Sequence, residues 1–574
     1  MVELRFGTLA EIAQKLRRDS RASVVATGAL PPLNAALYVH DEVDATIERW
    51  RASPTSRLLV LTGSAGHGKS AAIAVALGNS EPKKLVVRPD ATHADAKHET
   101  YREGLRRFLD QWQSGDDRKY ILGINLGRAL DFFSLLEDRE RYPELAIALN
   151  REYDLGLPVD DRTPKGITLV DLSTRVQPII SNDGLDVPLF GKILENFDPL
   201  NPESIIADAW AHQLSSGLGK YDPLLANIRL LSHPEFRRNL VEAVASTMVR
   251  HGVHVTPRRL LDLISRMILP PSLEPYIGAD GMWTAAAVSE LSSEMHWGKR
   301  KDQTLLHVLF PNQVSLLEVE DDLVRQMRHE NPTYVRSRQV DDRVMSWSSD
   351  ATALASDIPP WFLEYLGWNA SRRIGSEGTR LLIQVAAWTA PRTRAPERVK
   401  RVVDFITLAD GLEADHEKQR RMLELAIRQA VTRSHFRVMA AEMVRNEISV
   451  QVHRAGTALA LRTELERFHV QLDPRKPSKH VRAFKVRIQR PDRPDIPLEI
   501  DWPTYDLLCS IYAGEHPGTS RRSSHVIESL LRVLQTASYM DRRLTCVTTA
   551  GRVLRLTRDN TSVAARMNAE VTNA

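Results

Sequence analysis

The sequence predicts an α/β core with a parallel sheet and flanking helices, then a mainly helical region and a C-terminal mixed domain rich in strands. Three observations predict this organisation. A short apolar run at 58–62 leads through a glycine-rich loop into an alanine-rich helical segment. Apolar residues then recur at helical spacing, and period-two alternation becomes common after Ile448. The predicted parts are a helical lead-in at 1–50, the core at 51–200, the helical region at 201–445 and the C-terminal domain at 446–574.

Length and composition indicate a globular chain of more than one domain. Its 574 residues exceed what a single core can organise, since domains usually hold about 100 to 200 residues. A hydrophobic content of 43% with 26% charged residues excludes a disordered or membrane-embedded class. No apolar run approaches the ~18 to 20 residues of a bilayer span, and the N-terminus lacks the apolar centre of a signal peptide. We therefore expect a cytoplasmic protein with no membrane contact.

The loop "GSAGHGKS" has the spacing GxxxxGK[ST] of a phosphate-binding loop, or P-loop. Residues without a Cβ let backbone N–H groups converge on phosphate oxygens. The pattern predicts that the loop binds ATP with Mg²⁺, with the lysine reaching the β and γ phosphates and the serine hydroxyl ligating the metal. The residues assigned to nucleotide binding are Gly63, Gly66, Gly68, Lys69 and Ser70, of which Lys69 is also catalytic and Ser70 is a metal ligand.

The flanking segments match the context that such a loop requires. Before it, "RLLVLT" is typical of a buried parallel strand, and after it "SAAIAVALG" favours a helix that stops near Gly78. The phosphates would then lie at a helix N-terminus, where the helix dipole favours anions. We expect the side chain of His67, inside the loop, to be a solvent-facing spacer because backbone donors do the binding there.

An acidic residue at the tip of a neighbouring strand should hold the magnesium water shell. Three further strands are predicted, in "KKLVVRPDAT", "KYILGINLG" and "GITLVDLSTR". Asp171, directly after the third, is the best candidate for a catalytic carboxylate and Mg²⁺ ligand, and Asp90 after the first is the alternative. Leu172 stands where many hydrolytic ATPases carry a water-polarising glutamate. For either aspartate, a polar residue that only caps a turn is the other interpretation.

Two more polar residues follow the predicted strands. Asn125, after the second, is positioned to sense the γ-phosphate or the attacking water, and we count it as catalytic. Arg175, four residues beyond Asp171, is predicted to bind a phosphate as a sensor. Both remain open to the simpler interpretation of a residue that caps a strand end.

The middle of the chain is predicted to be helical. One helix should cover "NIRLLSHPEFRRNLVEAVASTMVRHG" and stop at Gly252. The next, "VTPRRLLDLISRMILPP", has Thr256 as its cap and Pro257 in its first turn. We expect Arg258 and Arg259 to be solvated charges, although a helical arginine completes the site of some ATPases.

The positive charge of the chain lies near its C-terminus. Residues 471–574 contain 17 Lys and Arg against 11 Asp and Glu, and several basic residues alternate along predicted strands. They are candidates for contacting the phosphates of DNA, with a solvated basic sheet face as the alternative. The residues concerned are Lys485, Arg487, Arg490, Arg552, Arg555 and Arg558. A helix is predicted in "SSHVIESLLRVLQTA", and "RTRAPERVKR" is predicted to be a linker.

The order of these motifs resembles the F component of DNA phosphorothioation-dependent restriction systems. The resemblance rests on "LRFGTLAEIAQKLRRDSRASVVATG", "GSAGHGKS", "ILGINLGRALDFF", "ITLVDLSTR", "NIRLLSHPEFRRNL", "VTPRRLLDLISRMIL" and "PLEIDWPTYDLLCSIYAGEHPG", and it covers most of the chain. It implies a bacterial antiviral-defence ATPase that acts with sister subunits on DNA lacking the host's sulfur modification. It assigns nucleotide binding to the P-loop residues and leaves the catalytic base unassigned. No nuclease constellation is evident, so cleavage would belong to a partner.

A second function class stays open beside restriction. A nucleotide-switched signalling or scaffold ATPase, similar to the STAND and AAA+ groups, would change its assembly with further copies of itself when ATP binds. Leu172 in place of a glutamate favours this class, because slow hydrolysis is then expected.

Overall fold

The computed structural model describes the chain in segments, and its contacts divide it into two units, Met1–Val399 and Lys400–Ala574. Each unit is described by itself. The described residues are 4–17, 19–20, 30–78, 84–91, 99–153, 164–182, 184–215, 218–292, 297–309, 322–331, 333, 338–368, 376–390, 397–411, 416–433, 447–454, 457–464, 468–473, 483–490, 493–514, 543–547, 552–558 and 567–573.

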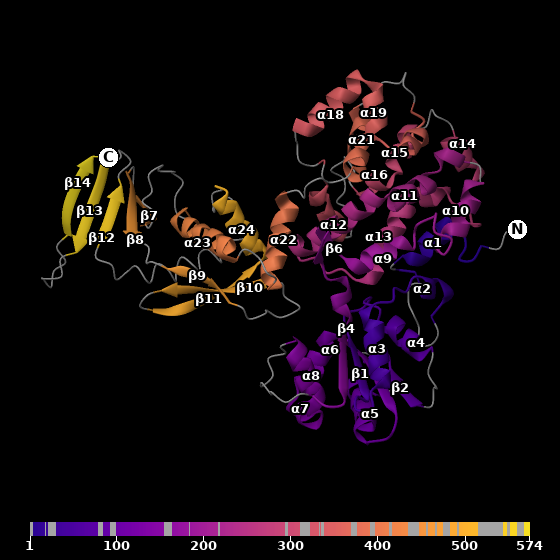
Figure 1. Cartoon of the computed structure of the whole chain (residues 1–574), viewed down its shortest axis with the longest axis horizontal. Coiled ribbons are helices and arrows are strands. Elements are labelled where there is room, and N and C mark those ends of the chain that lie inside the picture. Colours follow the sequence, from indigo (N-terminus) through magenta and orange to yellow (C-terminus); the bar gives the residue numbers. More distant parts are fainter. Residues whose placement is uncertain are drawn as a thin grey trace. The chain divides into compact units, whose positions relative to one another are not determined.

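A four-stranded parallel sheet forms the centre of the α/β part of unit 1, with the strand order β2-β3-β1-β4 (Figure 1). The register pairs Thr62 on β1 with Ile124 on β3 and with Asp171 on β4, so these strands end at one edge. All four strands coincide with predicted ones, which confirms those predictions. Their bounds are β1 Leu58–Thr62, β2 Leu85–Arg88, β3 Lys119–Ile124 and β4 Ile167–Asp171.

Helices cover both faces of this sheet because β1 is apolar on both sides. Leu58 and Val60 pack into one apolar cluster, and Leu59 and Leu61 pack into the other. Alternate residues of a strand point to opposite faces, so a continuous apolar run suits a sheet buried on both sides. Helices α5, α6 and α8 supply side chains to the first cluster, and α3 and α4 to the second. The bounds are α3 Glu42–Ala52, α4 Lys69–Leu77, α5 Tyr101–Gln113, α6 Leu126–Phe133, α7 Leu136–Arg141 and α8 Pro143–Tyr153.

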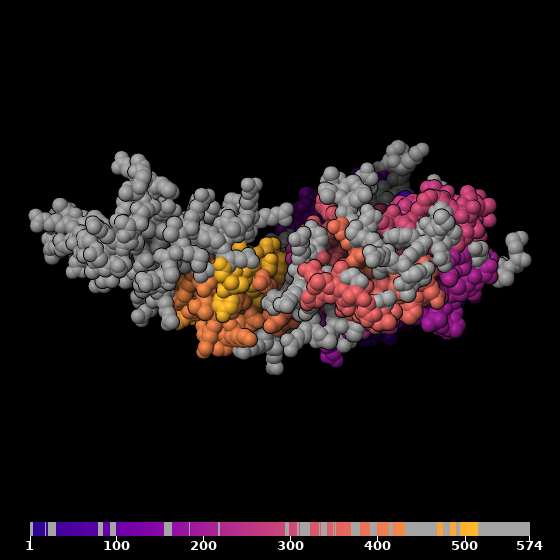
Figure 2. Space-filling view, turned by 90° about the horizontal axis from the view of Figure 1, so that it is seen from above, coloured from indigo at the N-terminus to yellow at the C-terminus, as the bar shows by residue number. Residues whose placement is uncertain are grey.

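The rest of unit 1 is mainly helical. In Figure 2 the helices after α13, coloured magenta to salmon, form much of the face seen from above. The elements are α1 Leu9–Leu16, α2 Pro32–Ala36, η3 Leu172–Val176, β5 Ile179–Ser181, β6 Gly184–Asp186, α9 Pro188–Glu195, α10 Ala207–Leu214, η4 Gly219–Tyr221, α11 Pro223–Ser232, α12 Pro234–His251, α13 Pro257–Ile268, η5 Pro271–Tyr276, α14 Ala285–Leu291, α15 Trp297–Asp302, α16 Leu305–Leu309, α17 Asp322–Met327, η8 Arg328–Glu330, α18 Arg338–Ser349, α19 Ala351–Asp357, α20 Pro360–Tyr365 and α21 Ser376–Thr389.

The prediction of one helix at 227–252 is wrong, because two helices, α11 and α12, cover this stretch. The break falls at His233, which adopts an extended conformation directly before Pro234. Proline disfavours helical geometry in the preceding residue, which explains the break. The predicted stop at Gly252 is confirmed, as is the start of α13, where the Thr256 hydroxyl accepts a hydrogen bond from the N–H of Arg259 at 3.3 Å.

Helix α1 packs against α13, although about 240 positions separate them in the sequence. The Ser265 hydroxyl donates to the carbonyl of Ala13 at 2.6 Å, and the Arg17 guanidinium donates to the carbonyl of Leu269 at 3.3 Å. The start of the chain and α13 therefore form one helical pair.

Unit 2 contains three helices and two antiparallel sheets within its described residues. Phe405, Phe484, Trp502 and Tyr505 pack together where α22 and α24 meet the sheet β11-β10-β9. A second sheet has the order β14-β13-β12-β8-β7. The bounds are α22 Glu397–Ala409, α23 His416–Arg433, β7 Glu447–Arg454, β8 Thr457–Glu464, β9 His469–Leu472, β10 Ala483–Arg490, β11 Arg493–Asp501, α24 Trp502–Tyr512, β12 Arg543–Val547, β13 Arg552–Arg558 and β14 Met567–Asn573.

The predictions for unit 2 have mixed outcomes. The alternating segments after Ile448 do form strands, as predicted. The linker prediction for "RTRAPERVKR" is wrong from Glu397 onward, where α22 begins, and its earlier residues lie outside the described part. The helix predicted in "SSHVIESLLRVLQTA" also lies outside the described residues. Among the helices that the structure does describe, none combines the length and the apolar character needed to cross a bilayer.

Candidate functional site

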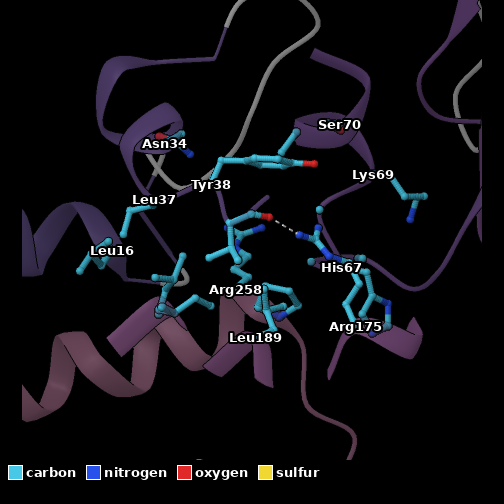
Figure 3. A pocket seen from close by; sticks show the side chains of 18 of the residues that line it. Leu16, Asn34, Leu37, Tyr38, His67, Lys69, Ser70, Arg175, Leu189 and Arg258 are labelled. Carbon is cyan, nitrogen blue, oxygen red and sulfur yellow. Dashed lines mark hydrogen bonds between the residues drawn. The ribbon is translucent and has the colours of Figure 1, made fainter. Parts of the chain in front are cut away.

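A cavity of about 390 Å³ opens at the carboxyl edge of the parallel sheet in unit 1. One side is formed by residues 65–71, with Asp90 after β2 and Asn125 after β3. The other side comes from α1, α2, α9 and α13, and it is mostly apolar. In Figure 3, Leu16 and Leu37 lie to one side of the Tyr38 ring and Lys69 lies to the other. The cavity thus has a polar half at the glycine-rich loop and an apolar half facing it.

The loop between β1 and α4 needs its glycines. Gly63, Gly66 and Gly68 have φ values of 137°, 90° and 91°, which side chains with a Cβ rarely adopt. A Cβ on Gly66 would also lie 3.0 Å from the Thr256 hydroxyl oxygen at the start of α13. The loop therefore wraps tightly before it enters α4, and one of its turns lies directly against α13.

Lys69 starts α4, and its amine is held at the centre of the loop. Nζ donates to the carbonyls of Gly63 at 2.7 Å and Ser64 at 3.1 Å, and to Oδ1 of Asn125 at 2.5 Å. Burial lowers the pKa of Lys69, while the charge of Asp90 acts in the opposite direction. The structure thus brings together Lys69 and Asn125, which the sequence assigned to one site, and Ser70 lines the same cavity.

His67 is fully buried, so the prediction of a solvent-facing side chain is wrong. Its Nδ1 accepts a hydrogen bond from the Ser64 N–H at 2.7 Å, and its ring packs edge-on against His254 with 4.9 Å between centroids. The tight turn of the loop folds the imidazole back over its own backbone, where Nδ1 satisfies an otherwise unpaired donor. The buried Nε2 has no hydrogen-bond partner within the described part of the chain.

Acidification should destabilise the fold through His67. Burial, followed by the charges of His254 and Lys69, lowers the pKa of His67 from 6.5 to about 4. The unfolded chain therefore binds a proton more readily than the folded chain, so the stabilising contribution is present above pH 6.5 and is lost as the pH falls toward 4. The difference reaches about 2 kcal/mol near pH 5.

His67→Asn isolates this effect, because asparagine also offers an acceptor to the Ser64 N–H but does not titrate. We expect the unfolding free energy of the wild type, measured in urea at pH 7.5, 6 and 5, to fall more steeply than that of the variant. Parallel pH profiles for the two proteins would contradict the assignment.

The two candidate carboxylates occupy different places. Asp90 lines the cavity and follows β2. The chain that leaves β2 passes close to β3 at Gly123, where an added Cβ would clash with the Pro89 carbonyl oxygen. The absence of a side chain at Gly123 lets residues 89–90 reach over the strand toward the loop. Asp90 and Asn125 therefore face the cavity from adjacent strands.

Asp171 does not line the cavity, and its oxygens are engaged locally. Oδ1 accepts from the Ser173 N–H at 2.9 Å, and Oδ2 accepts from the Ser173 hydroxyl at 2.8 Å. The Tyr153 hydroxyl also hydrogen-bonds the carboxylate and contacts the hydroxyl of Thr62. Burial, with the Asp171 charge second, raises the pKa of Tyr153. Asp171 thus joins the ends of β1, β4 and α8.

The next residue, Leu172, is fully buried in the apolar cluster that contains Leu59 and Leu61. Its side chain belongs to the core, so it offers the cavity nothing that could polarise water.

Arg175 lines the cavity, but its guanidinium is held by the segment before α3. Nε donates to Asp41 at 2.6 Å and one terminal nitrogen donates to the Val39 carbonyl at 2.7 Å. Its Cζ lies 5.5 Å from the ring centroid of Tyr38. The other terminal nitrogen of Arg175 faces the glycine-rich loop, where a Cβ added on Gly68 would lie 3.9 Å from it.

Sequence reasoning missed the part of the cavity that α13 forms. Arg258 is half-buried and lines the cavity, so the expectation of a plain solvated charge is wrong for this residue. Its backbone N–H approaches the Gly66 carbonyl at 3.4 Å. The motif "TPRR" does indicate an arginine in the capped first turn of a helix. The sequence does not reveal which part of the protein that turn faces.

Two of the basic residues proposed for DNA contact, Lys485 and Arg487, have described side chains, and both lie on β10. Arg487 is paired with Asp473 through two contacts of 3.2 Å, and Lys485 is exposed on the same strand. The side chains of Arg490, Arg552, Arg555 and Arg558 lie outside what the structure describes.

A preformed metal site is not seen in the described part of the chain, which contains no cluster of three or more His, Cys, Asp or Glu side chains placed to hold an ion. The oxygens at the cavity are nevertheless those that Mg²⁺ prefers when it is bound by one or two protein groups together with phosphates. The Ser70 hydroxyl and the Asp90 carboxylate both line the cavity and would fit this arrangement.

The comparisons with known proteins identify no relative. No protein-family profile matches the chain, and neither the curated proteins nor the solved structures include a significant match. The resemblance to the restriction component therefore stays a prediction.

Proposed function

We propose that the chain is a P-loop ATPase that binds MgATP in the cavity of unit 1. The observation that carries this proposal is the position of Lys69. A buried amine lies at the N-terminus of α4, inside a loop with three positive-φ glycines, and opens onto a cavity of ligand size. Burying an ammonium group is costly, and burial lowers the pKa of Lys69 even though the charge of Asp90 acts against this. The phosphates of a nucleotide would add further negative charge beside the amine.

The surrounding groups support the same chemistry. The N-terminal N–H groups of α4 and the loop amides would bind the β and γ phosphates. Ser70 and one of the two aspartates would hold Mg²⁺, whose charge would offset that of the phosphates. Asn125, which now accepts a hydrogen bond from Lys69, would orient the γ-phosphate or the attacking water.

The biological role that we propose is the ATPase component of a bacterial defence complex that restricts DNA lacking phosphorothioate modification. This role rests on the motif order described above, and its partners would be sister subunits and unmodified DNA in the cytoplasm. DNA contact would involve the basic strands of unit 2.

A second candidate is a nucleotide-switched scaffold, and two observations favour it. Leu172 is buried where a catalytic glutamate would be expected, which supports slow hydrolysis. The first turn of α13 lies against Gly66 and presents Arg258 to the cavity, so a bound γ-phosphate would act directly on a helix outside the sheet.

One experiment separates the two roles. ATP turnover of the purified chain is measured without DNA, with unmodified DNA and with phosphorothioated DNA, and the particle mass is measured with and without ATP. For the restriction role we expect turnover to rise at least about fivefold with unmodified DNA only, which corresponds to an activation free energy lower by about 1 kcal/mol. Equal, slow turnover in all three conditions together with an ATP-dependent mass change would instead support the scaffold. If the purified chain does not bind ATP under any of these conditions, both roles are contradicted.

A further inference from the structure

The wall that faces the glycine-rich loop is apolar and contains an aromatic ring. Tyr38, from the loop that joins α2 and α3, lies across the cavity in Figure 3. The aliphatic side chains around it come from helices α1, α2, α9 and α13 and from the residue that follows α2. They are Leu16, Leu33, Leu37, Leu189, Ile193 and Leu261.

Arg175 fixes this wall to the end of β4. Its side chain is 5% exposed, and it binds Asp41 and the Val39 carbonyl, which lie 134 and 136 positions away in the sequence. The same guanidinium lies over the ring of Tyr38, whose hydroxyl donates to Asp44 at 2.8 Å. Two contacts therefore hold the segment that carries Tyr38. Arg175 lies over the ring, and the ring hydroxyl is bonded to Asp44 of α3.

We propose that the nucleoside of the bound triphosphate lies against this wall and that Arg175 is a positioning residue for the wall. The inference rests on the proposed function, because it needs phosphates at the glycine-rich loop. Aromatic rings and aliphatic side chains bind nucleobases by stacking and by excluding water. Two of the nitrogens of Arg175 already have short hydrogen bonds, and one of these is to a carboxylate. Turning the group toward a phosphate would break a largely buried ion pair.

This arrangement separates two kinds of ligand. A nucleoside triphosphate would use both halves of the cavity, whereas inorganic tripolyphosphate has no base and would use the loop alone. Disturbing the wall should weaken the first ligand and leave the second unchanged. A role for Arg175 as a phosphate ligand predicts that both ligands weaken together.

The test uses Asp41→Asn in the full chain. Asp41 also caps α3, where Oδ1 accepts the Val43 N–H at 2.9 Å. Asparagine is an equally good cap, so the substitution removes the charge that holds Arg175 and keeps the cap. Tyr38→Ala removes the ring, and Tyr38→Phe keeps the ring as its matched control.

Binding of MgATP and of magnesium tripolyphosphate is measured by calorimetry, and folding is checked by thermal unfolding. We expect Asp41→Asn and Tyr38→Ala to weaken MgATP about tenfold, as loss of one stacking contact does, and to change tripolyphosphate less than about twofold. Tyr38→Phe keeps the ring but loses the hydrogen bond to Asp44, so it should weaken MgATP less than Tyr38→Ala does and leave tripolyphosphate unchanged. Equal weakening of both ligands, or no change in either, would overturn the inference. Failure of the wild type to bind either ligand would instead overturn the proposed function.

Discussion

Lys69→Ala is expected to remove nucleotide binding and turnover. The amine lies between the loop carbonyls and Asn125, to which it donates hydrogen bonds. In the proposed site it neutralises the β and γ phosphates, and loss of one such preorganised contact lowers rates by about 100- to 1,000-fold. We expect ATP affinity to fall by about 100-fold and ATP hydrolysis to fall to the background rate, measured by calorimetry and by phosphate release.

Lys400→Ala is the matched control, because Lys400 is exposed in unit 2 and does not line the cavity. It should bind and hydrolyse ATP like the wild type. Lys69→Ala also leaves the carbonyls of Gly63 and Ser64 without their donor, so its thermal unfolding must be compared with that of the wild type. A folded Lys69→Ala protein that keeps wild-type affinity for ATP would refute the proposed site.

The strand–loop–helix unit could be predicted from the sequence because its signals are local. The apolar run at 58–62, the glycines at 63, 66 and 68 and the helix that ends at Leu77 are each specified by neighbouring residues. The first turn of α13 was predictable for the same reason, since Thr256 and Pro257 define a helix start without reference to the rest of the chain.

The apolar half of the cavity could not be predicted, because it depends on contacts between distant segments. Leu16, Tyr38 and Leu261 lie far apart in the sequence and carry no shared motif. The packing of α1 on α13 and the pairing of Arg175 with Asp41 help to bring them to one cavity. His67 was misjudged for a related reason: the pattern shows where the backbone must turn, but not which side chain the turn encloses.

The choice between the two aspartates depended on strand order, which a single sequence does not specify. Asp171 directly follows an apolar run and was the stronger candidate by that criterion. In the sheet, β4 pairs with β1 on the side away from β3, and Asp171 turns to Ser173 and Tyr153. Asp90, at the end of β2, reaches the cavity because Gly123 leaves room for the crossing at Pro89.

Asp90→Asn and Asp171→Asn should therefore have different effects. Removing the cavity carboxylate is expected to lower magnesium-dependent ATP hydrolysis by about 100-fold, because a metal-side charge acts mainly on the reaction. Removing the Asp171 charge should change hydrolysis far less. It should instead lower the unfolding free energy by about 1 to 3 kcal/mol, because asparagine satisfies the Ser173 N–H but weakens the bonds from two hydroxyl groups.

Both variants are compared with the wild type in three measurements. These are ATP hydrolysis, ATP affinity with and without Mg²⁺, and unfolding in urea. If Asp90 faces the metal, Asp90→Asn loses the gain in affinity that Mg²⁺ provides, while metal-free ATP binds at least as tightly, since a negative charge near the phosphates has been removed. Asp171→Asn should keep the full magnesium effect. The opposite pattern, with the magnesium effect lost in Asp171→Asn and kept in Asp90→Asn, would return the metal to the end of β4 and would require Asp171 to leave Ser173 when nucleotide binds.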